Sequence, residues 1–212
     1  MDAVETNGPG WFIVFEGDDG AGKSTISAAI ARRLAEEGLT VLLTREPGGT
    51  PAGEQVRQLL RERLTPWAEV FAFLLARAEL VETVVRPALE RGATVICDRF
   101  EGSTFAYQGY ARGLDLKALR AANHIATGGL SPHLNILLDL DPRVALERKR
   151  GEDGPIATGL EDLAFHERVR EGYHALAHSH PGRWVMIDAS RPLAEVEQDA
   201  WDAVHRLVNA SR

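Results

Sequence analysis

The chain has 212 residues, of which 44% are hydrophobic, and its formal net charge is −7 at pH 7. This size suits one domain with one large core, and the acidic balance without a basic block excludes nucleic acid or an anionic membrane as the expected partner. Cys97 is the only cysteine, so no intrachain disulfide can form and we expect a cytoplasmic protein.

Residues 1–10 are polar and glycine-containing, so they predict a flexible tail before a single domain at 11–212. The apolar run at 12–16 predicts a buried strand. It leads into Gly17, four further residues, and then Gly22, Lys23 and Ser24, which is the complete phosphate-loop pattern. A chance match is disfavoured because the sequence also predicts a strand before the loop and a helix after it.

The chemistry of this loop explains its spacing. Glycines let backbone N–H groups turn inward around a phosphate, and the following helix N-terminus adds partial positive charge. Lys23 can reach the β and γ oxygens, and the Ser24 hydroxyl can be a ligand of Mg²⁺. The pattern predicts a nucleoside triphosphate site made by Gly17, Asp18, Asp19, Gly20, Ala21, Gly22, Lys23, Ser24 and Thr25.

Strands and helices alternate along the rest of the chain. Ile26, Ile30 and Leu34 recur at helical spacing before Gly38. Buried strands are predicted at 39–44, 93–98, 134–139 and 184–188, and helices at 52–63, 67–91, 115–127, 143–150, 161–178 and 192–208. Pro87 should restart or kink its helix, and Asp115 is a plausible helix cap. This order predicts an α/β fold with a five-stranded, mostly parallel sheet, helices on both faces and right-handed crossovers.

Acidic and basic residues end two of the predicted strands. Asp98 could hold Mg²⁺ through water together with Ser24, and Arg99 could clamp a second phosphate. A structural ion pair at the end of the strand is the alternative for Asp98 and Arg99. Asp139 ends the next strand, but residues 139–142 are also typical of a turn and helix cap.

Further segments accompany the phosphate loop: Thr-Arg-Glu-Pro-Gly-Gly-Thr at 44–50, Asp-Arg-Phe at 98–100, Ser-Thr-Phe-Ala-Tyr-Gln-Gly at 103–109 and Phe-His-Glu-Arg-Val-Arg-Glu-Gly-Tyr at 165–173. Together they span nearly the whole chain, and they resemble the bacterial thymidylate kinases. The resemblance implies a three-layer P-loop NTPase fold. It also implies a homodimer that uses Mg²⁺ and transfers the γ-phosphoryl of ATP to thymidine 5′-monophosphate (dTMP).

Position by position, the resemblance implies an acceptor site. It assigns Asp19 to the 3′-hydroxyl of the deoxyribose, Phe73 to stacking on thymine and Arg77, one helical turn later, to a hydrogen bond with the base. Periodicity alone would place Phe73 in the core. Arg99 matches the clamp on the monophosphate.

The remaining acceptor residues line the same site in the resemblance. Arg45 and Pro47 belong to a lining loop, and Ser103 and Thr104 are polar contacts near the base. Tyr107 crowds the 2′ position and so favours deoxyribose, although ordinary packing would also explain a tyrosine there. The adjoining polar wall is Gln108.

The polar segment 151–159 predicts a mobile lid, about 148–161 in extent, and here the sequence departs from the resemblance. The family's lid arginine and its flanking acids fall on Ile156, Ala157 and Gly159. Arg148 and Arg150 remain as candidates to stabilise the transferring phosphoryl, or they only complement a helix C-terminus.

Weaker signals have simpler interpretations. His174, His178 and His180 are close in sequence, and a solvated surface is favoured over a metal site because a third strong ligand is missing from the pattern. Asp18 is expected to point to solvent. The alternative functions are a kinase for another monophosphate and a nucleotide-dependent switch, but a GTPase is disfavoured because the Asn-Lys-x-Asp signature is missing.

Overall fold

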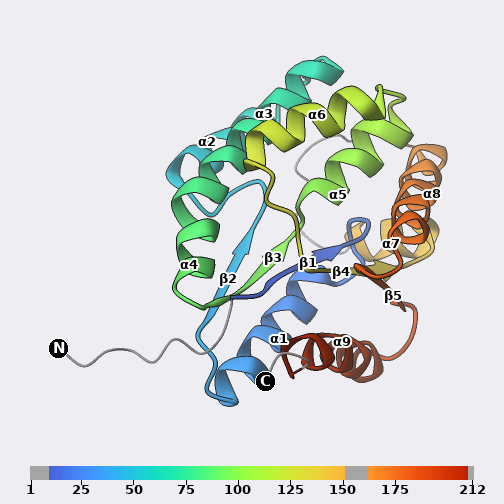
Figure 1. The fold of residues 1–212 in the computed structure, drawn as a ribbon. Helices are drawn as coiled ribbons and strands as arrows, with labels where there is room; N and C mark the ends of the chain where they lie inside the picture. Colours follow the sequence, from blue (N-terminus) through green and yellow to red (C-terminus); the bar gives the residue numbers. More distant parts are fainter. Residues whose placement is uncertain (1–9, 151–161, 210–212) are drawn as a thin grey trace.

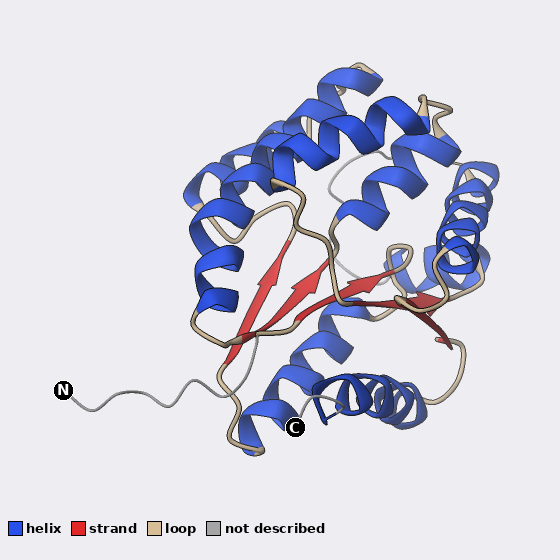
Figure 2. Ribbon diagram, viewed as in Figure 1, coloured by secondary structure: helices blue, strands red, loops and turns tan. Residues whose placement is uncertain are grey.

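The computed structural model describes residues 10–150 and 162–209. Five strands form one sheet in the order β2-β3-β1-β4-β5, and every neighbouring pair is parallel. The carboxyl ends of the strands therefore meet at one edge (Figure 2). The predicted five-stranded sheet is confirmed, with strands β1 (Phe12–Glu16), β2 (Val41–Arg45), β3 (Thr94–Asp98), β4 (Leu134–Asp139) and β5 (Trp184–Asp188).

Helices cover both faces of this sheet (Figure 1). On one face lie α1 (Lys23–Glu36) and α9 (Leu193–Asn209). The opposite face is covered by α3 (Pro66–Leu80), α4 (Arg86–Glu90), α5 (Glu101–Thr104), α6 (Leu116–Thr127) and α8 (Leu163–Ser179). The other helical segments are α2 (Pro51–Leu59), α7 (Pro142–Arg150) and two π-helical turns, η1 (Val81–Val85) and η2 (Phe105–Ala111).

The strand sequences explain the three layers. Ile13 and Phe15 of β1 pack in the core beneath α1 and α9, whereas Phe12 and Val14 pack in the core beneath α3 and α4. A strand in a parallel sheet is buried on both faces, so it needs a continuous apolar run rather than an alternating one. Phe12, Ile13, Val14 and Phe15 all have no exposed surface.

Two helical regions differ from the prediction. The helix predicted at 67–91 restarts near Pro87 as expected, with Pro87 in the first turn of α4, but the unpredicted π turn η1 joins α3 to α4. A π turn widens the helix just before a proline that cannot donate a backbone hydrogen bond. The helical segment 101–111, formed by α5 and η2, was not predicted from the sequence.

Glycines in the segment 101–111 lower its helix propensity, which concealed it in the sequence. Both glycines lie where an added side chain would have to displace a neighbouring side chain. A Cβ added to Gly102 would lie 2.8 Å from Glu16 Oε1, and one added to Gly109 would lie 2.4 Å from Leu116 Cδ2.

Other expectations fall into two groups. Asp115 caps α6 as predicted, since its side chain accepts a hydrogen bond from the backbone of Ala118 at 2.6 Å. Residues 1–9 and most of the predicted lid, 151–161, lie outside the described residues. Within the described ranges, none of the helices combines the length and the apolar composition that crossing a membrane requires.

Candidate nucleotide site

The phosphate loop connects β1 to α1 at the carboxyl edge of the sheet. Gly22 has φ 88° and forms the N-cap of α1, and Gly17 has φ 141°. Both values lie in a region that side chains disfavour, and a Cβ on Gly17 would lie 2.6 Å from the carbonyl oxygen of Leu138. The glycines at these two positions therefore allow the tight loop that the motif predicts.

Lys23 begins α1 and folds back over the loop. Its side chain is buried, and Nζ donates a hydrogen bond to the carbonyl oxygen of Asp18 at 2.8 Å. Burial, together with the nearby Arg99 charge, lowers the pKa of Lys23 to about 8, although the carboxylates of Asp98, Asp19 and Asp18 oppose the shift. A phosphate chain in the loop would meet a lysine whose charge is little shielded by water.

Ser24 and Asp98 meet beside the loop. Asp98 ends β3, which pairs directly with β1, and its Oδ2 accepts a hydrogen bond from Ser24 Oγ. Ser24 is exposed to solvent. A hydroxyl and a carboxylate side by side are the oxygen donors that Mg²⁺ prefers, so these two residues fit the predicted metal. The geometry brings together the two residues that the sequence assigned to the metal.

Arg99 adopts an unusual backbone conformation directly after β3. Its φ of 72° is in the left-handed region, where Arg99 is the one described residue other than glycine. The guanidinium donates to the carbonyl of Gly17 at 3.1 Å and to Ser103 Oγ at 3.1 Å, and it forms an ion pair with Asp19. Arg99 therefore lies against the phosphate loop, where a second phosphate could approach it.

Glu16, at the end of β1, holds the segment after Arg99 in place. This carboxylate is fully buried and accepts hydrogen bonds from the backbone N–H groups of Phe100 and Ser103, from Ser103 Oγ and from Tyr173 Oη. Burial raises the pKa of Glu16, although these donors and the Arg99 charge oppose the shift. Sequence reasoning assigned no role to Glu16 or Tyr173. An acid ending an otherwise apolar strand was the available signal.

The prediction that Asp18 points to solvent is wrong. Asp18 is only 6% exposed, and its carboxylate accepts hydrogen bonds from Tyr107 Oη at 2.7 Å and from His166 Nδ1 at 2.8 Å. His166 lies on α8 and is also buried. The prediction failed because the contact joins residues 148 positions apart, which local pattern cannot reveal.

Arg77 is buried in a polar cluster with Glu46, Thr104 and Asn123. Its Nη2 lies 2.7 Å from Glu46 Oε2, and Nη1 donates to Thr104 Oγ1 at 3.1 Å and to Asn123 Oδ1 at 2.9 Å. Phe73, one turn earlier on α3, is partly buried against the small apolar cluster formed by α2 and α3. Phe73 thus has the packing contacts expected from periodicity.

Three further predicted acceptor residues have other partners. Arg45 is exposed and pairs with Glu54 at 3.2 Å, and Pro47 is buried and follows a cis peptide bond. Gln108 is buried and donates from Nε2 to Glu69 Oε1 at 2.8 Å. Arg45 therefore differs from Pro47 and Gln108 in being open to solvent.

Of the predicted lid residues, the structure describes the side chain of Arg148 only. Arg148 is exposed, with Nη1 3.4 Å from the carbonyl oxygen of Ala189. The side chain of Arg150 lies outside the described part of the chain, as do Ile156, Ala157 and Gly159. Their predicted roles stay predictions.

The turn after β4 caps α7 as its sequence suggested, because the Asp141 side chain accepts a hydrogen bond from the backbone of Arg143 at 2.8 Å. Asp139 pairs with Arg170 through two contacts of 2.7 Å and with His174 Nε2 at 2.9 Å. His174 is thus held against a carboxylate rather than simply solvated. Across the described ranges, His, Cys, Asp and Glu form no group of three or more that could hold a metal ion.

The fold is that of a P-loop NTPase. The sheet is parallel, the phosphate loop follows its central strand, and the neighbouring strand ends in an aspartate of the kind that holds Mg²⁺ in this class. The thymidylate kinase family model matches residues 15–200. The chain belongs to the thymidylate kinase family.

Individual relatives cover almost all of the chain. A thymidylate kinase of Thermomicrobium roseum is 49% identical over 205 residues, which is 95% of this chain and 98% of the relative. One of Deinococcus radiodurans is 47% identical over 198 residues, covering 92% of this chain and 96% of the relative. The crystal structure of thymidylate kinase from Ehrlichia chaffeensis superposes with a TM-score of 0.79 at 31% identity, covering 93% of this chain and all of that one.

Proposed function

We propose that this chain catalyses the transfer of the γ-phosphoryl group of ATP to dTMP, giving ADP and thymidine 5′-diphosphate for dTTP synthesis. The observation that carries the proposal is the position of Arg99, whose guanidinium bonds to Gly17 of the phosphate loop and to Ser103 at the start of the acceptor side. A cation in this position can hold a second phosphate against the first.

The reaction requires alignment more than covalent chemistry. An oxygen of the dTMP phosphate attacks the γ-phosphorus, and the bond from that phosphorus to the β–γ bridging oxygen breaks as ADP leaves. Backbone N–H groups of the loop and Lys23 bind the triphosphate, while Arg99 orients the attacking monophosphate. Arg148 or Arg150 would stabilise the transferring group once the lid closes and excludes water.

Mg²⁺ is the proposed cofactor. Ser24 and Asp98 would hold it, Asp98 through water, because their oxygens are already adjacent. When bound, the ion neutralises charge on the β- and γ-phosphates and so favours in-line attack.

The nucleoside of the acceptor defines the rest of the site. We assign Phe73 to stacking on thymine, Arg77 and the polar residues Ser103, Thr104 and Gln108 to the surroundings of the base, Asp19 to the 3′-hydroxyl, and Tyr107 to the 2′ position. Arg45 and Pro47 line the approach. Support comes from the contacts of Arg77 with Thr104 and of Arg99 with Ser103 and Asp19.

We further propose that the chain acts as a homodimer in the cytoplasm. Exposed apolar side chains gather on α2, α3 and α6, which pack beside one another in Figure 1. The exposed fractions are 47% for Leu59, 60% for Phe71, 55% for Leu75 and 81% for Ile125. A second copy that packs against this face would remove those surfaces from water.

The test is a coupled assay of ADP production with dTMP, other nucleoside monophosphates, or no acceptor. We expect ADP production that depends on dTMP in the unmodified chain and its loss in Lys23→Ala. ADP production that depends on a different nucleoside monophosphate would show that the chain is a kinase for that monophosphate. Binding of ATP and dTMP without turnover would favour a nucleotide-dependent switch instead.

A further inference from the structure

The carboxylate of Asp18 is the meeting point of two distant side chains. Tyr107 Oη donates to Oδ1 at 2.7 Å, His166 Nδ1 lies 2.8 Å from Oδ2, and the backbone N–H of Asp19 donates to Oδ1 at 2.8 Å. An ionised carboxylate only accepts hydrogen bonds, so both Tyr107 and His166 act as donors. This arrangement also assigns a proton to Nδ1 of the imidazole.

The Asp18 carboxylate stays ionised although it is buried. Burial raises its pKa, but the hydrogen bond and charge of His166, the Tyr107 hydroxyl and the backbone of Asp19 outweigh burial, so the pKa lies below its ordinary value. A charged acceptor makes stronger hydrogen bonds than a neutral one. Asp18 therefore forms strong hydrogen bonds with both Tyr107 and His166, and we call its carboxylate the anchor of these two side chains.

Tyr107 is placed by this anchor and by edge contacts. Its ring meets Phe165 at 6.1 Å and Tyr173 at 6.4 Å between centroids, and the Arg99 guanidinium carbon lies 5.5 Å from the ring centroid. The hydrogen bond to Asp18 is the directional contact of Tyr107 among those described.

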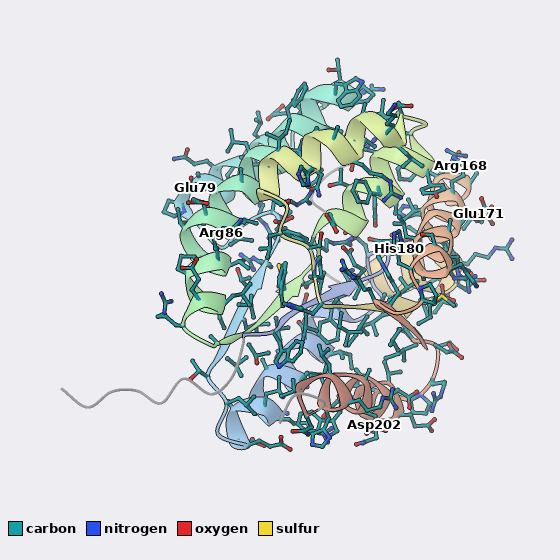
Figure 3. The ribbon with its side chains drawn as sticks, viewed as in Figure 1. Glu79, Arg86, Arg168, Glu171, His180 and Asp202 are labelled. Atoms are coloured by element: carbon teal, nitrogen blue, oxygen red, sulfur yellow. The ribbon has the colours of Figure 1, made fainter. Side chains whose placement is uncertain are left out.

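His166 extends the anchor to α8. Figure 3 shows Arg168 and Glu171 on the outer side of that helix, and both are exposed, whereas His166 is 3% exposed and faces the loop. The imidazole thus ties the first turns of α8, directly after residues 151–161, to the phosphate loop.

We propose that Asp18 and His166 are positioning residues that set selectivity for a 2′-deoxyribose acceptor, by holding the Tyr107 ring beside Asp19 and Arg99. The inference rests on the proposed function, because Tyr107 must face the sugar of the acceptor. Its physical basis is that a tethered ring excludes a 2′-hydroxyl, whereas an untethered ring can swing aside. The phosphate loop would then contribute to acceptor choice as well as to triphosphate binding.

The experiment compares kcat/KM for dTMP with kcat/KM for ribothymidine 5′-monophosphate, which differs only by the 2′-hydroxyl. Asp18→Ala and Tyr107→Phe should each reduce this ratio by about tenfold, the worth of one hydrogen bond to a charged group. The double variant should be no worse than either single variant, because both remove one interaction. Asp18→Asn keeps an oxygen acceptor for Tyr107 but loses its charge, so its ratio should lie between those of the unmodified chain and Asp18→Ala.

A matched pair of variants on α8 tests the second partner. His166→Ala should reduce the ratio in the same direction, whereas His174→Ala, on the same helix and also paired with a carboxylate, should leave it unchanged. Thermal unfolding of each variant identifies any that fails to fold, and Asp18→Asn and Tyr107→Phe, which alter few atoms, keep the comparison available.

The outcomes separate the two proposals. Failure of the unmodified chain to phosphorylate dTMP would remove the proposed function itself. Normal activity with an equal loss of kcat/KM for both acceptors in Asp18→Ala would overturn the positioning role alone, and so would a ratio that His166→Ala and His174→Ala change equally.

Discussion

Arg77 Nη2 lies 2.7 Å from Glu46 Oε2, and the two side chains are 1% and 3% exposed. Arg77 also donates to Thr104 and Asn123, so its guanidinium joins α3, α5, α6 and the residue directly after β2 at one buried point. Oε1 of Glu46 is buried, and no described residue donates a hydrogen bond to it. Each charge of this pair therefore depends on the other for most of its compensation.

Loss of either Arg77 or Glu46 should lower the free energy of unfolding. Arg77→Leu leaves the Glu46 carboxylate buried without its cation, and we expect the free energy of unfolding to fall by about 3 to 5 kcal/mol at pH 8. The matched control is Arg32→Leu, since Arg32 forms an exposed pair with Glu36 at 3.9 Å and its loss should change stability by less than about 1 kcal/mol. Urea unfolding measures both. Equal effects would show that the buried pair has no special role in stability.

The same pair predicts how stability depends on pH. Burial raises the pKa of Glu46 from its ordinary value of 4.5 to about 7, against the opposing charge of Arg77. The folded state then binds a proton that the unfolded state releases, so this contribution to stability is complete below pH 4.5 and is lost as pH rises through 7. Compared with Glu46→Gln, the unmodified chain should lose stability between pH 5 and pH 8. Parallel pH profiles for the two proteins would contradict the shift.

The strands of the sheet were predictable because their sequences carry the signal themselves. Each of the five predicted strands agrees with the structure within two residues at either end, since continuous apolar runs bounded by turns are a local pattern. The segment 101–111 was missed because Gly102 and Gly109, which pack closely against Glu16 and Leu116, lower its helix propensity. Tertiary packing there overrides local propensity.

Some features of the candidate site could likewise be predicted from the sequence, and others could not. The loop geometry, the pairing of Ser24 with Asp98 and the position of Arg99 follow from a motif and a strand end, so sequence could predict them. The burial of Asp18 depends on His166, which comes from a helix far along the chain. Because such a contact requires the fold, a polar residue in a glycine-rich loop could not be distinguished from a solvated one.

The low pKa of Lys23 predicts proton uptake on binding. In the free chain this pKa is about 8, and the negative charge of a bound triphosphate should raise it. ATP binding should therefore take up a proton near pH 8, and affinity should fall about tenfold between pH 7 and pH 9. Lys23→Arg is the control, because a guanidinium does not titrate in this range. Calorimetry in buffers of different ionisation enthalpy measures the proton, and equal pH dependence in the two proteins would contradict the prediction.

The pairing of Ser24 with Asp98 predicts a specific metal defect. Ser24→Ala and Asp98→Asn should each raise the Mg²⁺ concentration for half-maximal activity by about tenfold or more, since each removes an oxygen from the proposed metal site. Ser27→Ala is the matched control, because the Ser27 hydroxyl is buried one turn later and bonds to the carbonyl oxygen of Ser24. A magnesium titration of ADP production distinguishes them. The same requirement in all three variants would exclude Ser24 and Asp98 as ligands.

The apolar face formed by α2, α3 and α6 predicts how two copies associate. Phe71 on α3 is 60% exposed, and Phe71→Asp would place a charge in the proposed interface, where it would be buried without a partner. We expect the unmodified chain to elute at twice the subunit mass of 23.2 kDa and Phe71→Asp to elute at the subunit mass. Leu193→Asp is the control, since Leu193 is 57% exposed on α9, on the opposite face of the sheet, and should leave the dimer intact. Light scattering coupled to gel filtration measures the masses, and a monomeric unmodified chain, or a dimer that survives Phe71→Asp, would rule out this face.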